Sequence, residues 1–389
     1  MTTKRLGTQR SDQICIKTVM DVSDPAIEFD SDGVSNHFHL AKERLVKEYF
    51  PGDSGREQID IIAAAIKVEG VGRTYDCIMG VSGGADSSYV AIRAKELGLR
   101  PLAVHLDNGW NTDTAVSNIE LLLNELDIDL FTHVINWEEF KDIQRSLFRA
   151  SVPNIEVATD HAITALLYHK AAEYGVRYIL SGSNVETESI LPRSWGHDNR
   201  DWRSIKAIKK KFGNPSVGTK SYPHLTPFQF LRYILGNKIR FVPVLNYGGY
   251  NKAAAVKVMQ QRFGYNAYAR KHGESRFTRF FQEYYLPAKF GFDKRRAHFS
   301  SMIASDTMTR EAAMAELDRD MYDPIEKMID IEYCSRKLGF DVTEWDGVMS
   351  AAPAQAKDYP NNGWLFDHTS NRITALVRKF AKGEMFRGE

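Results

Sequence analysis

The chain has 389 residues, of which 43% are hydrophobic and 26% are charged, and its formal net charge is +1. These values are typical of a globular protein long enough for two or three domains, and a net charge near zero provides no general attraction to nucleic acid or to an anionic membrane. The basic N-terminus has no apolar core, no apolar run approaches the length of a membrane span, and the three cysteines lie far apart. We therefore expect a cytoplasmic protein with no membrane contact, no disulfide framework and no nucleic-acid partner.

Short apolar runs alternate with helix-periodic stretches in the first two thirds of the chain. The first run, 77–81, precedes a helix that stops at Gly98, and the next helix can be capped by Thr112 or Asp113. A later helix is expected to open at residues 159–161. The predicted strands are 77–81, 100–107, 129–135, 176–180 and 241–245, the last of them an edge strand because of Pro243. Strands that alternate with helices imply a parallel sheet covered on both faces.

Beyond about residue 245 the pattern becomes helical. Helices are predicted at 251–263, at 275–285 before Pro287, and from Asp323 to Gly339. We therefore expect an α/β fold in which a parallel sheet has helices on both faces, followed by a helical C-terminal domain. The predicted segments are an N-terminal region at 1–70, the sheet domain at 71–245 and the helical domain at 246–389.

The most informative segment joins the first strand to its helix and reads Ser82-Gly83-Gly84-Ala85-Asp86-Ser87-Ser88. Two adjacent glycines let backbone N–H groups close on an anion, and the helix dipole favours negative charge there. The serines add hydroxyl donors, and Asp86 can hold the Mg²⁺ that accompanies a phosphate. The segment lacks the Gly-Lys-Ser/Thr of the common nucleoside-triphosphate loop, and its glycines do not fit G-x-G-x-x-G. We interpret it as a phosphate cradle, with a plain glycine turn as the alternative.

Further candidates follow the other strands, because ligands of parallel sheets bind at the carboxyl ends of the strands. Asp107 can contact adenosine, or it can merely build an Asp-Asn-Gly turn. Asn184 and Glu188 can contact Mg²⁺, ATP or a substrate, or they can cap a helix. Asp160 can be catalytic or can belong only to a helix N-cap.

The pattern Ser-Gly-Gly-x-Asp-Ser resembles the pyrophosphate loop (PP-loop) of the ATP pyrophosphatases, which include GMP synthetase, NAD synthetase, asparagine synthetase and the tRNA thiolases. Members of this superfamily cleave ATP to AMP and pyrophosphate, adenylate a carbonyl oxygen and then let a nucleophile displace AMP. From about residue 13 to 320 the chain is similar to a narrower family, the bacterial N-acetyl sugar amidotransferases of O-antigen and flagellin-sugar biosynthesis. The segments that carry this similarity are 79–88 with 104–111, 159–163, 181–188, and 274–281 with 286–287 and 293–298.

The resemblance implies an enzyme of lipopolysaccharide biosynthesis that uses ATP, Mg²⁺ and ammonia. It would convert the acetamido group of a nucleotide-linked sugar to an acetamidino group through an O-adenyl imidate, with release of AMP and pyrophosphate. The implied catalytic residues are Asp86, Asp160, Asn184 and Glu188. The implied ligands of ATP are Ser82, Gly83, Gly84, Asp86, Ser87, Ser88, His105, Asp107 and Gly182, with Asp86 also holding Mg²⁺. The implied ligands of the sugar are Glu274, Arg276, Arg279, Lys294 and Arg295.

The N-terminal region departs from this family. Its members usually begin with two C-x-x-C pairs that are spaced like a structural zinc site. The matching positions of this chain are Cys15, Thr18, Ser35 and Phe38, so one thiol of the four remains. One thiolate does not make a tetrahedral zinc site. We therefore expect that no zinc binds and that packing alone holds this segment.

The chain shows no sign of its own source of ammonia. Residue 2 is Thr2, whereas an N-terminal glutaminase needs a cysteine there. The resemblance implies a separate glutaminase subunit and an ammonia-channel subunit, similar to the imidazole glycerol phosphate synthase pair. Two other functions stay open: a tRNA 2-thiolation enzyme of the same superfamily, which needs a reactive cysteine and a basic face, and a nucleotide-binding protein without activity.

Overall fold

Five parallel strands form one sheet in the order β3-β2-β1-β4-β5 in the computed structural model, which describes residues 12–196, 198–268 and 273–366. The strands are β1 (Cys77–Gly80), β2 (Pro101–Asp107), β3 (Leu130–Val134), β4 (Tyr178–Ser181) and β5 (Arg240–Pro243). The last strand lies at an edge, as its proline predicts. The strand order reverses between β1 and β4, because the chain builds outward from β1 on one side and then crosses to the other. The loops after β1 and β4 therefore lead to opposite sides of the sheet and leave a crevice between them. In open α/β sheets, ligands bind in this crevice.

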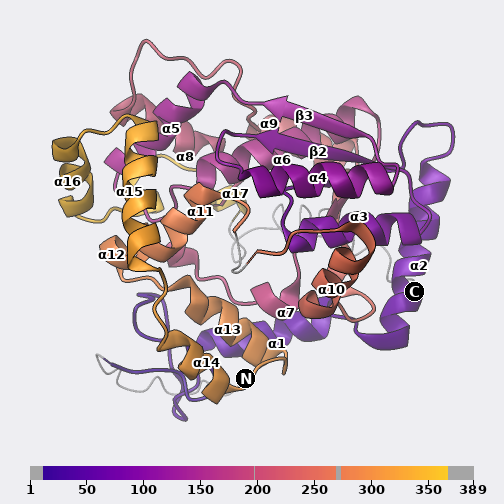
Figure 1. Cartoon of the computed structure of the whole chain (residues 1–389), viewed down its shortest axis with the longest axis horizontal. Helices are drawn as coiled ribbons and strands as arrows, with labels where there is room; N and C mark the ends of the chain where they lie inside the picture. The colour runs from indigo at the N-terminus through magenta and orange to yellow at the C-terminus, as the bar shows by residue number, and fades with distance from the viewer. Residues whose placement is uncertain (1–11, 197, 269–272, 367–389) are drawn as a thin grey trace.

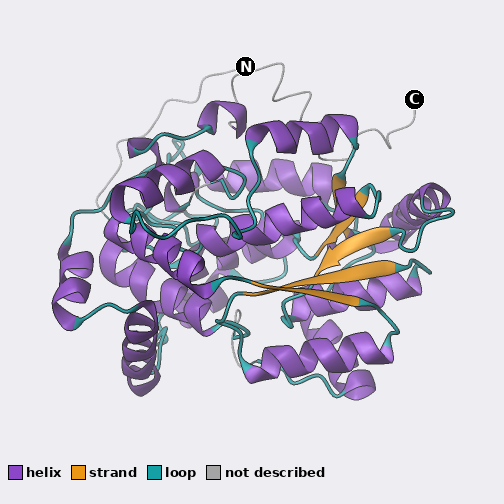
Figure 2. Cartoon of the chain, turned by 90° about the horizontal axis from the view of Figure 1, so that it is seen from above, coloured by secondary structure: helices purple, strands orange, loops and turns teal. Residues whose placement is uncertain are grey.

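Alternate residues of the central strand face opposite sides of the sheet, and each side has its own hydrophobic cluster. Ile78 packs with α5 (Trp137–Arg149), α6 (Val157–Glu173) and α8 (Trp202–Phe212). Met79 packs with α2 (Gly52–Glu69), α3 (Ala85–Glu96), α4 (Asp113–Glu125) and α10 (Lys252–Phe263). Figure 2 shows helices on both sides of the strands. The prediction of a parallel sheet covered on both faces is confirmed.

Two helices differ from their predicted limits. Helix α6 begins two residues earlier than expected, with Glu156 at the N-cap position, so Asp160 lies inside the first turn and donates its backbone N–H to the Glu156 carbonyl at 3.1 Å. Helix α11 (Arg276–Phe280) does not end before Pro287 but continues through a π-helical turn at 281–285 into α12 (Leu286–Phe290). Pro287 therefore lies inside a continuous helical segment, where it has no N–H to donate to the preceding turn, and the π-helical turn directly precedes it.

The chain after α12 continues as helices, among them α13 (Lys294–Ala304), α14 (Arg310–Leu317), α15 (Pro324–Leu338) and α16 (Val342–Ser350). Helix α15 has the predicted ends: the Asp323 carboxylate accepts from the N–H of Glu326 at 3.0 Å, and Gly339 adopts the left-handed conformation with φ of 75°. The helical character of the C-terminal part is therefore as predicted.

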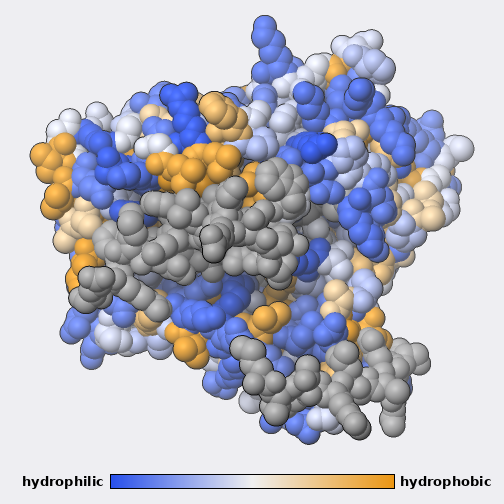
Figure 3. All heavy atoms as spheres, turned by 180° about the vertical axis from the view of Figure 1, so that it is seen from behind, coloured by the Kyte–Doolittle hydropathy of each residue, from blue (hydrophilic) through white to orange (hydrophobic). Residues whose placement is uncertain are grey.

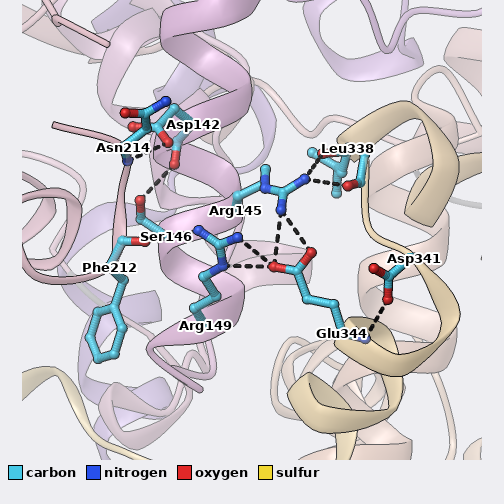
Figure 4. A network of polar contacts seen from close by, with 10 residues as sticks. Asp142, Arg145, Ser146, Arg149, Phe212, Asn214, Leu338, Asp341 and Glu344 are labelled. Atoms are coloured by element: carbon cyan, nitrogen blue, oxygen red, sulfur yellow. Dashed lines mark hydrogen bonds and ion pairs between the residues drawn. The ribbon is translucent and has the colours of Figure 1, made fainter. Parts of the chain in front are cut away.

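An ion-pair network joins this helical part to the sheet domain (Figure 4). The Glu344 carboxylate of α16 lies between two guanidinium groups of α5, at 2.8 Å from Arg145 Nη2 and beside Arg149. Arg145 also donates to the carbonyl of Leu338 at 2.9 Å. Because Arg145 of α5 contacts both Glu344 of α16 and the Leu338 carbonyl of α15, the C-terminal helices have a fixed position against the sheet domain.

The N-terminal segment is held by hydrogen bonds as well as by packing. Cys15 is fully buried, and its sulfur accepts the N–H of Ser35 at 3.3 Å. Burial raises the pKa of the Cys15 thiol, but hydrogen bonds from Ser35 and Thr18 outweigh burial and lower the pKa overall. Arg296 of α13 donates to the carbonyl of Val19 at 2.8 Å. The expectation of packing alone is thus wrong, because a C-terminal helix anchors this segment through its polar groups.

Within the described ranges, no cluster of three or more His, Cys, Asp or Glu side chains is arranged to hold a metal ion, and the absence of zinc stays a prediction.

One hydrophobic cluster contains Cys15, Ile78 and Phe280, so the three predicted segments share a core, while their boundaries stay predictions. No helix of the described part is both long and apolar enough to cross a membrane. Hydrophilic residues predominate on the face in Figure 3, and the apolar ones form separate patches.

Candidate active site

The loop after β1 presents the first turn of α3 at the carboxyl edge of the sheet. Gly84 is the N-cap residue and supplies no side-chain cap, so the first N–H groups of α3 are not capped by the loop. Around them, the hydroxyls of Ser82 and Ser87 lie 3.1 Å apart, and Ser87 also donates to the Gly84 carbonyl at 3.1 Å. N–H groups at a helix start together with hydroxyl donors form an anion-binding site. This geometry could accept a phosphate, and phosphate binding by the loop stays a prediction.

Close packing explains the glycines of this loop. Gly83 has a φ of +77°, and a Cβ atom there would lie 2.4 Å from the carbonyl oxygen of Ala115. A Cβ on Gly84 would lie 2.8 Å from a carboxylate oxygen of Glu274. A Cβ on Gly182, after β4, would lie 3.2 Å from the carbonyl carbon of Asp86. The loops after β1 and β4 and residue 274 therefore meet at one place, although they are far apart in the sequence.

A cavity of about 470 Å³ lies at this meeting point, a volume within the range of small-molecule sites. The predicted site residues that line it are Ser82, Gly84, Asp86, Ser87, Gly182, Glu188 and Glu274. It is also lined by residues that the sequence analysis did not single out, namely Lys252, Tyr265, Tyr268 and His298. The cavity thus combines the loop at the sheet edge with side chains from the C-terminal part of the chain.

Asp86 is the acidic group of the loop. Two side chains from the segment that follows β5 face its carboxylate. The Tyr250 hydroxyl donates to its carboxylate, and Lys252 Nζ lies 3.8 Å from its Oδ2 atom. Burial, together with the charge of Asp86, raises the pKa of Tyr250, which therefore acts as a neutral donor. Lys252 places a positive charge in the cavity. No local sequence pattern marks Lys252 as a site residue, because it reaches the cavity only through the packing of α10 against the sheet edge.

Two further tyrosines hold the loop in place. The hydroxyls of Tyr265 and Tyr268 donate to the carbonyl of Gly83 at 3.0 and 3.2 Å. Asn118 of α4 lies beside them, donating to the carbonyl of Asn266 at 2.9 Å. Because the Gly83 carbonyl is turned toward these tyrosines, it is turned away from the N–H groups of α3. Hydrogen bonds from within the protein therefore hold the loop in this conformation.

Helix α7 (Val185–Glu188) follows β4, is preceded by the predicted residue Asn184 and ends at the predicted residue Glu188. Asn184 caps it, accepting at its side-chain oxygen from the N–H of Thr187 at 3.0 Å and from the Thr187 hydroxyl at 2.9 Å. Glu188 lines the cavity. The structure therefore gives Asn184 the capping geometry, while Glu188 is placed where it can meet a ligand.

His105, Asp107 and Ser88 are not among the described residues that line the cavity. His105 is buried, with Nδ1 2.9 Å from the Val81 carbonyl. Asp107 accepts the N–H of Gly109 at 3.0 Å, which is the turn geometry. Ser88 is buried within α3. These residues support the shape of the sheet edge, and ATP contact by them stays a prediction.

Asp160 lies at the same edge, because α6 leads from the carboxyl edge of the sheet back to the start of β4. Burial and the nearby Glu156 carboxylate raise the pKa of Asp160 well above its usual value, and Lys294 of α13 opposes that shift. Lys294 stands one turn before His298 on α13, and His298 lines the cavity. Glu156 accepts a hydrogen bond from the Thr278 hydroxyl. A second polar cluster thus lies between α6, α11 and α13.

The raised pKa of Asp160 gives a pH-dependent stability. Below its usual pKa of about 3.9 both states of the protein hold this proton, and as the pH rises the unfolded chain releases it first. The native state therefore loses stability with rising pH until Asp160 itself ionises, in surroundings that include Glu156, Lys294 and Tyr222. We expect Asp160→Asn to gain stability relative to the wild type between pH 4.5 and 8. Thermal unfolding of both proteins at pH 4.5 and at pH 8 measures the difference in stability. A difference that is the same at the two pH values would refute the prediction.

The three arginines predicted to bind the sugar are engaged within the protein. Arg279 pairs with the buried Asp330 at 2.6 Å, and Arg276 pairs with the same carboxylate. Arg295 pairs with Asp293 at 2.8 Å. These contacts fix α11 to α15 and brace the start of α13. A role of these arginines as sugar ligands stays a prediction.

The donor set around Asp86 fits Mg²⁺. This ion prefers hard oxygen ligands and in nucleotide sites takes one or two carboxylates together with phosphates and water. Asp86 and Glu188 line the cavity beside the hydroxyls of Ser82 and Ser87. These side chains would hold the ion, which would neutralise charge on the phosphates of a bound nucleotide.

Lys252 gives a test of phosphate binding. Replacing Lys252 by alanine is expected to weaken binding of Mg·ATP about tenfold or more, because a hydrogen bond to a charged group contributes roughly 1.5–3 kcal/mol. Lys257→Ala is the matched control, since Lys257 is an exposed lysine on the same helix. Isothermal titration calorimetry measures both affinities. Equal affinities of the two variants would exclude contact between Lys252 and the phosphates.

The fold and the cavity define an α/β protein with a glycine-rich loop that lines a cavity at the point where the strand order reverses. Residues 274–372 match the family described as "LPS biosynthesis protein WbpG-like, C-terminal domain". This segment contributes Glu274 and His298 to the cavity. No curated protein matches the chain.

Solved structures with some similarity include three proteins, each 13% identical in sequence. The NMN synthetase of Francisella tularensis has a TM-score of 0.35, with 74% of this chain and 97% of that chain covered. The NH3-dependent NAD synthetase of Campylobacter jejuni has a TM-score of 0.34, with coverages of 73% and 93%. The predicted subunit of a tRNA methyltransferase from Methanocaldococcus jannaschii has a TM-score of 0.27, with coverages of 47% and 74%. Similarities at this level are too weak to support an assignment of function.

Proposed function

We propose that this protein is an ATP-dependent, AMP-forming amidotransferase of lipopolysaccharide biosynthesis. In this proposal it converts the acetamido group of a nucleotide-linked sugar to an acetamidino group with ammonia. The observation that carries the proposal is the composition of the cavity. One wall of the cavity is the Ser82–Ser87 loop, whose donors suit phosphates. Another wall is formed by Glu274 and His298, which belong to the segment that matches the lipopolysaccharide-biosynthesis domain.

The proposed reaction follows from the chemistry of an amide, whose carbonyl carbon is too weak an electrophile for ammonia. The N–H groups of α3 and Lys252 hold the β- and γ-phosphates of ATP while the amide oxygen attacks the α-phosphorus, and pyrophosphate leaves. Mg²⁺ held by Asp86 would stabilise the charge that develops on the pyrophosphate. Ammonia then adds to the imidate carbon, two protons are lost, and the C–O bond breaks. AMP leaves with the former amide oxygen, and the product is the amidine.

The intermediate must be kept from water, because hydrolysis would return the starting amide and waste ATP. The apolar groups Val256 and Ala267 and the rings of Tyr265 and Tyr268 line the same cavity. These four residues follow the last strand in the sequence and form the apolar part of the cavity wall beside the loop. This wall would limit the access of water to the adenylated oxygen.

The alternative of tRNA thiolation is disfavoured by the cysteines. All three cysteines of the chain are buried. Burial raises the pKa values of Cys77 and Cys334, so both stay protonated and unreactive. Cys15 has a lowered pKa but is fully buried and accepts the N–H of Ser35. A persulfide-carrying cysteine would need to be accessible, and none of the three is.

The ammonia source belongs to the proposal as well. We propose that a separate glutaminase and an ammonia-channel subunit supply ammonia, as the resemblance to the amidotransferase family implies. Free ammonium at high concentration would then replace both subunits in a test of this chain alone.

The test is incubation of the purified protein with ATP, Mg²⁺, ammonium and a panel of nucleotide-linked acetamido sugars, followed by mass spectrometry. The expected products are AMP, pyrophosphate and a sugar in which NH has replaced one oxygen. AMP without a modified sugar would reject the acetamido acceptor but keep adenylation. ADP in place of AMP would reject the proposed chemistry.

A further inference from the structure

Helix α7 carries Glu188 into the cavity, but it has only four residues. A helix of this length cannot be stable by itself, because the first hydrogen-bonded turn costs more than it returns. Its position is therefore set by neighbours. Asn246 accepts the N–H of Val185 at 3.0 Å, and further contacts of α7 come from α1 (Asn36–Glu48) and α13, which lie beside it in Figure 1.

Helix α1 holds both the end and the middle of α7. The Arg44 guanidinium donates through Nη1 to the carbonyls of Glu188 at 3.2 Å and of Ser189 at 2.8 Å. Tyr49, which directly follows α1, donates its hydroxyl to the Glu186 carboxylate at 2.8 Å. The last carbonyls of a helix have no partner within the helix, so a cation placed there satisfies them and opposes the dipole.

Helix α13 holds the other side. His298 Nδ1 lies 3.0 Å from the carbonyl of Thr187, and the Ser305 hydroxyl donates to the carbonyl of Glu186 at 3.0 Å. These contacts are made to the backbone, so they fix where α7 lies. The two contacts of Arg44 are the ones made to the carbonyls at the Glu188 end.

We propose that Arg44 and Tyr49 are positioning residues of the active site, and that they act by holding the Glu188 carboxylate in the nucleotide cavity. The N-terminal region is then a functional part of the site. The proposal rests on the proposed function, in which the cavity binds Mg·ATP and Glu188 faces that ligand.

The test is a double-mutant cycle on Mg·ATP affinity, measured by calorimetry without any sugar. Arg44→Ala and Glu188→Gln are each expected to weaken Mg·ATP binding, by roughly fivefold and tenfold. The double variant is expected to bind no more weakly than Glu188→Gln alone, because Arg44 acts through that carboxylate. A merely structural role would give additive losses. Arg44→Lys is expected to rescue only part of the loss, since an ammonium cannot match the planar guanidinium.

Two controls keep the test decisive. Lys47→Ala, on an exposed lysine of α1 that pairs with Glu43 at 3.6 Å, is expected to bind Mg·ATP like the wild type. Tyr49→Phe removes only a hydroxyl and serves if Arg44→Ala does not fold. Unchanged affinity in Arg44→Ala or in Glu188→Gln, or additive losses in the double variant, would overturn this inference alone. A wild-type protein that does not bind Mg·ATP would overturn the proposed function and this inference with it.

Discussion

Replacement of Asp86 by asparagine is expected to lower the rate of AMP formation by about three orders of magnitude. The carboxylate is the acidic group of the loop and lines the cavity, and one preorganised electrostatic contact is worth roughly 10²–10³ in rate, with more at a metal ligand. Asparagine keeps an oxygen that can accept the hydrogen bond of Tyr250, so the fold should be preserved. Release of AMP and pyrophosphate from ATP in the presence of ammonium and the sugar measures the effect.

The matched control is Asp113→Asn. Asp113 stands in the first turn of α4 as Asp86 stands in that of α3, but it is exposed and is not among the residues that line the cavity. We expect its AMP formation to equal that of the wild type. If Asp86→Asn kept the rate of Asp113→Asn, the loop would not be the nucleotide site.

Replacement of Gly83 by alanine is expected to lower the free energy of unfolding by about 2–5 kcal/mol. The positive φ at this position costs an L-residue about 1–2 kcal/mol, and overpacking a close contact costs roughly 1–3 kcal/mol. The contact is severe, because the new Cβ would lie 2.4 Å from the backbone oxygen of Ala115. Denaturant unfolding, followed by circular dichroism, measures the loss.

Gly72→Ala separates the two causes. Gly72 also has a φ of +77°, but a Cβ there would have no atom within 4 Å. It should lose only the conformational part, about 1–2 kcal/mol. Equal losses in the two variants would mean that the approach of α4 to the loop imposes no constraint at Gly83.

The sheet was predictable because its signals are local. The central strands β1 and β4 are short apolar runs, and the strand-loop-helix order around 82–88 indicated which loop would stand at the carboxyl edge. The alternating burial of Ile78 and Met79 on two faces also follows from a parallel sheet covered by helices. The ends of helices were harder to predict. Helix α6 begins before the predicted start at 159–161, because Glu156 takes the N-cap position without a side-chain hydrogen bond.

The rest of the site depends on tertiary contacts that no local pattern encodes. Lys252 and His298 reach the cavity from helices that lie beyond the sheet in the sequence. Arg276 and Arg279 look like free cations in the sequence, but the structure pairs them with Asp330, about fifty positions away. The sequence around Asp330 does not indicate this pairing, because a carboxylate in an amphipathic helix is usually exposed.

The most direct measurement of the proposed chemistry follows the oxygen of the acetamido group. The sugar would be prepared with ¹⁸O in the acetyl carbonyl and incubated with the protein, ATP, Mg²⁺ and ammonium, and the AMP would be analysed by mass spectrometry. Adenylation of the carbonyl oxygen predicts that AMP carries the label in its phosphate, in an amount equal to the amidine formed. Amidine accompanied by unlabelled AMP, or by ADP, would contradict the account.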